Sequence, residues 1–183
     1  MKPLLRFEGV TCHRGGRLLF EGLNLAIGPG DALHLQGPNG SGKSSLIRLA
    51  AGLLRANAGN IQRSELALAD EAAALDRELP LRRALRFWGG RIDQALEALD
   101  LARMAEVPVR LLSTGQVKRA TLARVVASDA PLWLLDEPLN GLDSDGIARL
   151  ASLIEAHLER GGAVLAASHG PLGGSWTHLE LGT

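Results

Sequence analysis

The chain has 183 residues, of which 46% are hydrophobic, so it is long enough for one well-buried core and short for two. Its 20 basic and 20 acidic side chains cancel, which leaves no overall positive charge to attract DNA, RNA or an acidic lipid surface. The single cysteine, Cys12, excludes an internal disulfide and a cysteine-based metal site. We expect one domain over residues 1–183, in a reducing compartment and without a nucleic-acid partner.

The N-terminus does not resemble a targeting segment. Residues 1–8 carry charges where a signal peptide needs an apolar run, and no stretch approaches the ~18 uncharged apolar residues of a membrane span. If the protein works at a membrane, another chain must cross the bilayer.

The first elements that the pattern predicts are strands. Residues 4–12 and 23–27 alternate apolar and polar positions and are separated by Gly15-Gly16, which predicts two antiparallel strands. A further short strand is expected over residues 32–36, where apolar residues lie two apart.

A glycine-rich loop follows that strand and leads into a helical pattern that ends near Gly52. Its glycines let the backbone curl so that N–H groups converge on phosphate oxygens, and the helix that opens at Lys43 adds the positive end of its dipole. Lys43 is expected to reach the β- and γ-phosphates, and the Ser44 hydroxyl to ligate Mg²⁺. The residues expected to form this nucleotide site are Gly37, Pro38, Asn39, Gly40, Ser41, Gly42, Lys43, Ser44 and Ser45.

The composition changes to Ala, Leu, Arg and Glu from about residue 65 to 112, which predicts a small helical insertion. One apolar stripe comprises Leu81, Ala84, Leu85 and Trp88, and a second follows Gly89-Gly90, over residues 92–99.

The second half alternates helices and strands. Helices are predicted over residues 116–127 and behind Ser144, a possible N-cap, and strands over 132–135 and 163–167. The strands are continuously apolar, which is typical of a parallel sheet with both faces buried and its ligands at one edge.

Two carboxylates lie at that edge, directly after the strand at 132–135. Asp136 is expected to hold Mg²⁺, which would keep its pKa low, and Glu137 to orient or deprotonate a water that attacks the γ-phosphate. Ser113, with the N–H groups of Thr114 and Gly115, would make a second anion site at the start of the next helix. Because the glycine loop already surrounds one side of the triphosphate, this second site suggests a nucleotide held by another subunit.

These segments together resemble the nucleotide-binding domain of ATP-binding cassette (ABC) proteins, over essentially the whole chain. The matching motifs are residues 37–44, 112–116 (Leu-Ser-Thr-Gly-Gln), 132–137, Leu142-Asp143 and Ser168-His169. The resemblance implies an α/β P-loop NTPase fold with a parallel central sheet, an antiparallel N-terminal β-layer and a small helical subdomain. It also implies ATP and Mg²⁺ as cofactors and an ATP-hydrolysing homodimer.

The resemblance assigns roles to single residues. It makes Glu137 the catalytic base, with Lys43 on the phosphates and His169 linking the γ-phosphate to Glu137. Asp143 would lie in a loop that communicates across the dimer. The residues that would complete the partner's site are Ser113, Thr114, Gly115 and Gln116.

The sequence departs from the family at two places. The family stacks adenine on an aromatic side chain near residue 14, where this chain offers His13 or Arg14, and the Arg14 guanidinium could stack instead. The family also carries a glutamine at the start of the helical insertion, where Glu71 or Asp70 stands here as a metal ligand.

Within the family, the chain is similar to the haem-exporter ATPases of bacterial cytochrome c maturation. The similarity lies in the short insertion and in the runs at residues 111–116, 130–138 and 160–169. It implies two copies bound peripherally to the cytoplasmic face of the inner membrane through a separate integral membrane subunit. The alternatives are the ATPase of another ABC transporter, a soluble ABC ATPase with a non-transport role, and a P-loop kinase.

Arginines crowd the predicted insertion, and they have two interpretations: a face that docks the membrane subunit or anionic lipid, or an ordinary solvated helix face. They are Arg77, Arg82, Arg83, Arg86 and Arg91.

Overall fold

An antiparallel layer begins the chain in the computed structural model, which describes residues 2–72 and 74–182. Its strands are β1 (Leu5–Arg14), β2 (Arg17–Ile27) and β4 (Ala58–Arg63), in the order β2-β1-β4. The predicted pair is confirmed, although β2 begins at residue 17 because the Gly15-Gly16 turn lets Arg14 pair with Arg17. The strand β4 was not predicted, because its mostly exposed side chains give no apolar alternation.

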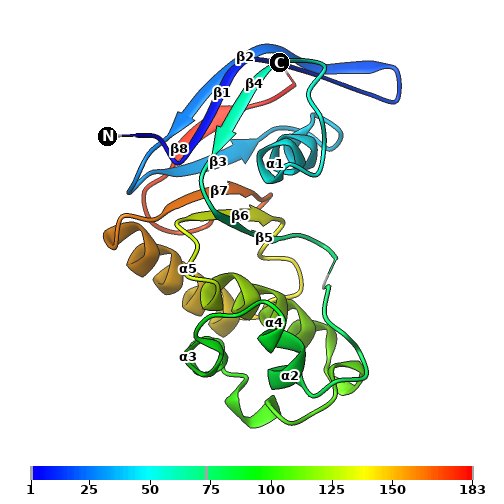
Figure 1. The fold of residues 1–183 in the computed structure, drawn as a ribbon, viewed down its shortest axis with the longest axis vertical. Helices are drawn as coiled ribbons and strands as arrows, with labels where there is room; N and C mark the ends of the chain where they lie inside the picture. The colour runs from blue at the N-terminus through cyan, green and yellow to red at the C-terminus, as the bar shows by residue number, and fades with distance from the viewer. Residues whose placement is uncertain (1, 73, 183) are drawn as a thin grey trace.

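A five-stranded parallel sheet forms the middle of the molecule (Figure 1). It has the order β5-β6-β7-β3-β8, and every neighbouring pair is parallel. Its strands are β3 (Ala32–Gln36), β5 (Leu66–Ala69), β6 (Leu132–Asp136), β7 (Ala163–Ala167) and β8 (Thr177–Glu180). The prediction of β3, β6 and β7 is confirmed.

The edge strand β5 shows that the expected helical insertion begins later than residue 65. It lies inside the range that we expected to be helical, and pairs with β6 from Leu66↔Leu132 to Ala69↔Leu135. Four residues are too few for a period to be read from sequence, so pairing rather than pattern defines this strand.

The parallel sheet separates two hydrophobic cores. Side chains alternate along β6, so Leu132 and Leu134 join the core shared with β1 and α1 (Lys43–Ala51), while Trp133 and Leu135 join the core on the opposite face. This two-sided burial explains why β6 reads as a continuously apolar run.

Helices of the second core occupy the end of the molecule opposite the antiparallel layer (Figure 1). They are α2 (Leu81–Arg86), α3 (Ile92–Ala98) and α4 (Thr114–Ala127), with single turns η1 (Ala102–Met104) and η2 (Val109–Leu111). We expected Trp88 to belong to the apolar stripe of α2, but it lies outside this helix. It follows the helix end and is 41% exposed, because Gly89 and Gly90, with φ of 72° and 82°, turn the chain away.

The last helix, α5 (Ser144–Glu159), packs beneath β7. Its N-cap is Asp143 and not Ser144: the Asp143 carboxylate accepts a hydrogen bond of 2.8 Å from the Gly146 N–H. Among the described residues, no helix has the length and apolar character needed to cross a membrane.

Candidate nucleotide-binding and catalytic site

The glycine loop connects β3 to α1, and its conformation depends on glycine. Gly37 and Gly42 have φ of 136° and 108°, a region that side chains with a Cβ rarely adopt. A Cβ added to Gly37 would also collide with the carbonyl oxygen of Leu181. Glycine at position 37 therefore lets the loop pass directly against the segment that follows β8.

Lys43 lies in the curl of this loop. Its ammonium donates to the carbonyl oxygens of Gly37 at 2.7 Å and Pro38 at 3.1 Å. The first N–H of α1 that finds a helical carbonyl is that of Leu46, which bonds to Gly42 at 2.8 Å. The N–H groups before it lack helical acceptors, so the loop offers both a cation and backbone donors to an anion.

A cavity of about 620 Å³ opens over the loop, a volume suited to a small-molecule ligand. It is lined by Arg14, Arg17, Leu19, Asn39, Gly40, Gly42, Lys43, Ser44, Ser45, Glu71, Glu137, Asn140 and His169. Two residues proposed as substitutes for missing family residues, Arg14 and Glu71, thus lie at the same cavity as the glycine loop. Gly37, Pro38 and Ser41 belong to the loop but are absent from this lining.

A hydrogen bond joins Ser44, which lines the cavity, to Asp136, which does not. The Ser44 hydroxyl donates to Asp136 Oδ1 at 3.0 Å, and the Asp136 side chain is buried. Burial raises the pKa of Asp136, and the neighbouring Glu137 carboxylate adds to the increase, while the Ser44 hydrogen bond opposes it. In the protein alone, desolvation of the carboxylate outweighs its hydrogen bond, and the low pKa expected with bound Mg²⁺ stays a prediction.

Glu137 follows directly after β6 in a left-handed conformation with φ of 47°, which is uncommon for a residue with a side chain. Its Oε1 atom is 3.5 Å from Nε2 of His169, which follows β7. Adjacent strands β6 and β7 bring these two side chains together at the carboxyl edge of the sheet.

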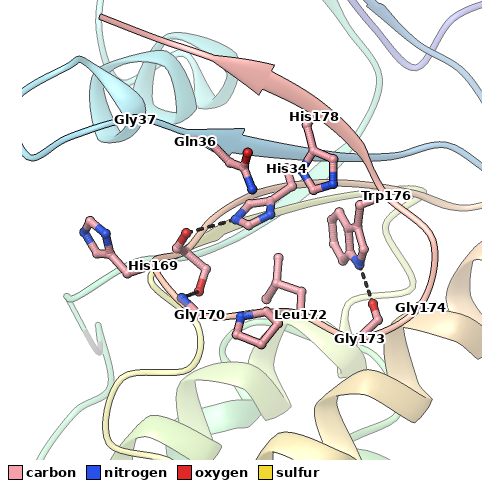
Figure 2. Close-up of a pocket in the computed structure, with 12 residues that line it drawn as sticks. His34, Gln36, Gly37, His169, Gly170, Leu172, Gly173, Gly174, Trp176 and His178 are labelled. Atoms are coloured by element: carbon pink, nitrogen blue, oxygen red, sulfur yellow. Dashed lines mark hydrogen bonds between the residues drawn. The ribbon is translucent and has the colours of Figure 1, made fainter.

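His169 also lines a second cavity, of about 500 Å³, shown in Figure 2. In it, Nε2 of the buried His34 lies 2.9 Å from the Ser168 carbonyl oxygen. Since a carbonyl only accepts, Nε2 carries the proton and His34 donates. His34 thus supports the segment that presents His169, which is a structural role.

The second predicted anion site lies at the start of α4. Ser113 caps this helix: its hydroxyl accepts from the Gln116 N–H at 3.2 Å, and the Gln116 side chain accepts from the Ser113 N–H at 2.8 Å. Neither residue lines the cavity over Lys43, nor do Thr114, Gly115 or Asp143. The structure therefore does not bring this group to the chain's own glycine loop.

Three residues near the site were not predicted from the sequence. Arg17 and Asn140 line the cavity, and Lys118 donates to the Glu137 carbonyl oxygen at 2.8 Å. Arg17 could have been found from the predicted hairpin, because a two-glycine turn places it opposite Arg14. No sequence pattern pointed to Lys118, because its contact joins segments nineteen residues apart.

A sequence model of the family described as ABC transporter matches residues 20–140. The chain belongs to the ABC transporter family. Among the curated relatives of this ABC ATPase is the cytochrome c biogenesis ATP-binding export protein CcmA of Sphingopyxis alaskensis. It is 58% identical over 177 residues, which cover 92% of this chain and 91% of the relative. The protein of the same name from Novosphingobium aromaticivorans is 59% identical, over 89% and 87% of the two chains.

Solved structures agree on the fold. An ATP-binding subunit of an ABC transporter superposes with a TM-score of 0.84 at 24% identity, over 91% of this chain and 79% of the other. A nucleotide-free ATP-binding cassette from an ABC transporter gives 0.75 at 19% identity, over 92% and 82%. The predicted P-loop ABC fold is confirmed, and as a member of this family the chain binds and hydrolyses ATP.

Proposed function

We propose that this ABC ATPase works as a homodimer and energises a separate, CcmB-like integral membrane subunit in c-type cytochrome biogenesis, with haem as the exported group. It would lie peripherally on the cytoplasmic face of the bacterial inner membrane. The observation that carries the ATPase part is the meeting of Lys43, Ser44, Glu137 and His169 around one cavity. The cytochrome c part rests on the 58% identity to a protein named for that process.

Mg²⁺ fits the donors that the site presents. Ser44 and the buried Asp136 supply hard oxygen atoms, with Glu71 as a further carboxylate at the cavity. The described residues contain no group of three or more potential ligands from His, Cys, Asp and Glu, so substrate phosphates and water would complete the coordination. A bound Mg²⁺ neutralises charge on the β- and γ-phosphates.

Different residues of the chain have different roles in the reaction. Lys43 and the N–H groups of the glycine loop hold the phosphates, and Glu137 takes a proton from the attacking water. The oxygen of that water bonds to the γ-phosphorus as the bond to the ADP oxygen breaks, giving ADP and inorganic phosphate. His169, 3.5 Å from Glu137, orients the base and contacts the γ-phosphate.

The position of the Ser113 group supports a dimer. Ser113 and Gly115 lie at the start of a 14-residue helix, whose dipole favours an anion there, yet they lie away from the chain's own cavity. A second copy placed face to face would bring this helix end to the partner's γ-phosphate. Each site would then need both copies, so dimer formation would depend on ATP.

An apolar surface supports a membrane partner. A cavity of about 420 Å³ lies between the end of α1, β5 and Trp88. Leu53 and Trp88 line it and are 66% and 41% exposed, and the neighbouring Phe87 is 84% exposed. Large apolar side chains left in solvent next to a cavity are typical of a protein interface. The exposed Arg83 and Arg86 lie beside them on α2 and would suit an acidic partner segment.

Co-expression tests the membrane role. The chain would be produced with the CcmB-like protein of the same organism, purified through a tag on that protein, and assayed for hydrolysis in lipid nanodiscs. We expect Glu137→Gln to co-purify in the same amount without turnover. A chain that never co-purifies, yet hydrolyses ATP fully alone, would instead support a soluble ABC ATPase.

A further inference from the structure

Lys118 is a partly buried residue of α4, and its side chain reaches Glu137 at the carboxyl end of β6. Its ammonium donates to the Glu137 carbonyl oxygen at 2.8 Å, and the Asn140 N–H donates to the same oxygen at 3.3 Å. On the other side of the peptide, the Glu137 N–H donates to the Ala167 carbonyl at 2.9 Å. The Glu137 backbone is therefore held from α4, from β7 and from its own turn.

This restraint acts on a strained residue. With φ of 47°, Glu137 occupies a conformation that persists only where the surroundings hold it. Of the contacts on its carbonyl, the one from Lys118 is shorter and carries a charge, so it is the stronger. Removing it would release the carbonyl and let the carboxylate move relative to His169.

Several carboxylates surround the Lys118 side chain and act on its ionisation. The carboxylates of Asp136, Glu71, Glu137 and Asp70 all favour its ionised form, although burial acts more strongly and lowers the pKa of Lys118. Lys118 is thus a basic side chain beside a carboxylate-rich site, in addition to Lys43.

We propose that Lys118 is a positioning residue for ATP hydrolysis: it holds the Glu137 backbone so that the carboxylate stays directed at the attacking water. This inference rests on the proposed role of Glu137 as the base. It does not require Lys118 to touch the nucleotide, and Lys118 is absent from the lining of the nucleotide cavity.

Three substitutions separate the hydrogen bond from the charge. Lys118→Met removes both, Lys118→Gln keeps a donor without charge, and Lys118→Arg keeps both. The matched control is Arg119→Met, the next residue of the same helix, whose guanidinium donates to the Leu99 carbonyl at 3.3 Å, away from the site.

We expect Lys118→Met to lower kcat by about 10- to 100-fold, the range for misplacing a catalytic group by about 1 Å, while KM for ATP and the melting temperature stay close to wild type. Lys118→Arg should recover most of kcat, Lys118→Gln should fall between the two, and Arg119→Met should retain it. A wild-type kcat in Lys118→Met, or equal losses in the Arg and Met variants, would overturn the inference.

A double-mutant cycle guards against a general structural effect. If Lys118 acts through Glu137, Lys118→Met should cost nothing further in a Glu137→Gln background, whereas independent effects would multiply. Multiplicative losses would overturn the positioning role. A wild-type protein without ATPase activity would instead overturn the proposed function itself.

Discussion

The Ser44 hydroxyl donates to Oδ1 of Asp136 across 3.0 Å, and so joins the first turn of α1 to the last residue of β6. One carboxylate is thereby buried at the point where phosphate and Mg²⁺ are expected to bind. A buried carboxylate can bind a cation, but without the cation its burial lowers the stability of the fold.

Asp136→Asn should therefore stabilise the nucleotide-free protein and impair hydrolysis. The pKa of Asp136 is raised above 3.8 in the folded state, so the folded protein binds this proton more tightly than the unfolded chain does. The stabilisation from that proton is complete below pH 3.8 and is lost as pH rises through the folded pKa. At pH 7 the ionised side chain destabilises the fold, and an uncharged amide removes this cost while it still accepts from Ser44.

Thermal unfolding at pH 7 and below pH 4 checks this, with Mg²⁺-dependent hydrolysis measured in parallel. We expect a higher midpoint for Asp136→Asn at pH 7, by about 2–4 °C for each kcal/mol gained, and a smaller gain in acid. Hydrolysis should fall by at least about 10²-fold. A lower midpoint at neutral pH would show that the carboxylate stabilises the fold.

Lys43→Ala should abolish nucleotide binding or turnover, because it removes the cation that the glycine loop presents to phosphate. Calorimetry with ATP and a steady-state assay measure the two effects. Arg48→Ala is the matched control, since Arg48 is an exposed basic residue in the last turn of the same helix. Near-normal binding and turnover in Lys43→Ala would show that the phosphates bind elsewhere.

Glu137→Gln should bind ATP but hydrolyse it about 10²- to 10⁴-fold more slowly, because the amide keeps the size of the side chain and cannot take a proton. The uncleaved ATP should then hold two copies together, which light scattering would detect as a doubled mass. Adding Ser113→Arg puts a bulky side chain at the capped end of α4 and should return the protein to monomer with ATP still bound.

The concentration of the protein limits this dimer test. Glu137→Gln protein that stays monomeric in saturating Mg-ATP, well above micromolar concentration, would argue against the ATP-dependent dimer. The measurement should be repeated with the membrane partner in nanodiscs, which raises the local concentration of the two copies.

His157 should make the fold sensitive to mild acid. Its ring is buried and stacks on Trp133, with the centroids 3.9 Å apart, and burial lowers the pKa of His157 below 6.5. Its contribution to stability is therefore present above pH 6.5 and is lost as pH falls through the folded pKa, because the unfolded chain takes up the proton first. His157→Phe keeps a stacked ring that cannot be protonated.

We expect the melting temperature of His157→Phe to depend less on pH between 7 and 5 than that of the wild type. His178→Phe is the control, because His178 is exposed. Equal pH dependence in the wild type and His157→Phe would assign the acid sensitivity to other groups.

The arginine-rich face of α2 should contribute to membrane-subunit binding through Arg83 and Arg86. Arg82 is better left unchanged, since it pairs with Asp93 and Glu106 within the helical region. Replacing Arg83 and Arg86 with Gln should reduce co-purification and leave hydrolysis by the free protein intact. The same change at Arg149 and Arg160, two exposed arginines of α5 and its C-cap, controls for net charge. Equal yields from both variants would favour an ordinary solvated face.

The sequence by itself determined the elements whose residues are neighbours in the chain. The glycine loop from Gly37 to Ser44 must curl because of its own backbone, and the apolar runs of β6 and β7 require burial on both faces. The same holds for Asp136 and Glu137 at a strand end. Local pattern therefore predicted the α/β fold and the main residues of the candidate site.

Only the tertiary structure decided what depends on contact between distant segments. The strands β4 and β5 exist because β1 and β6 pair with them, and their own residues show no period. The raised pKa of Asp136 comes from how deeply the fold buries it, and the contact from Lys118 to Glu137 exists because α4 packs beside the end of β6. Burial and distance are properties of the packed chain, and no spacing of residues along the sequence encodes them directly.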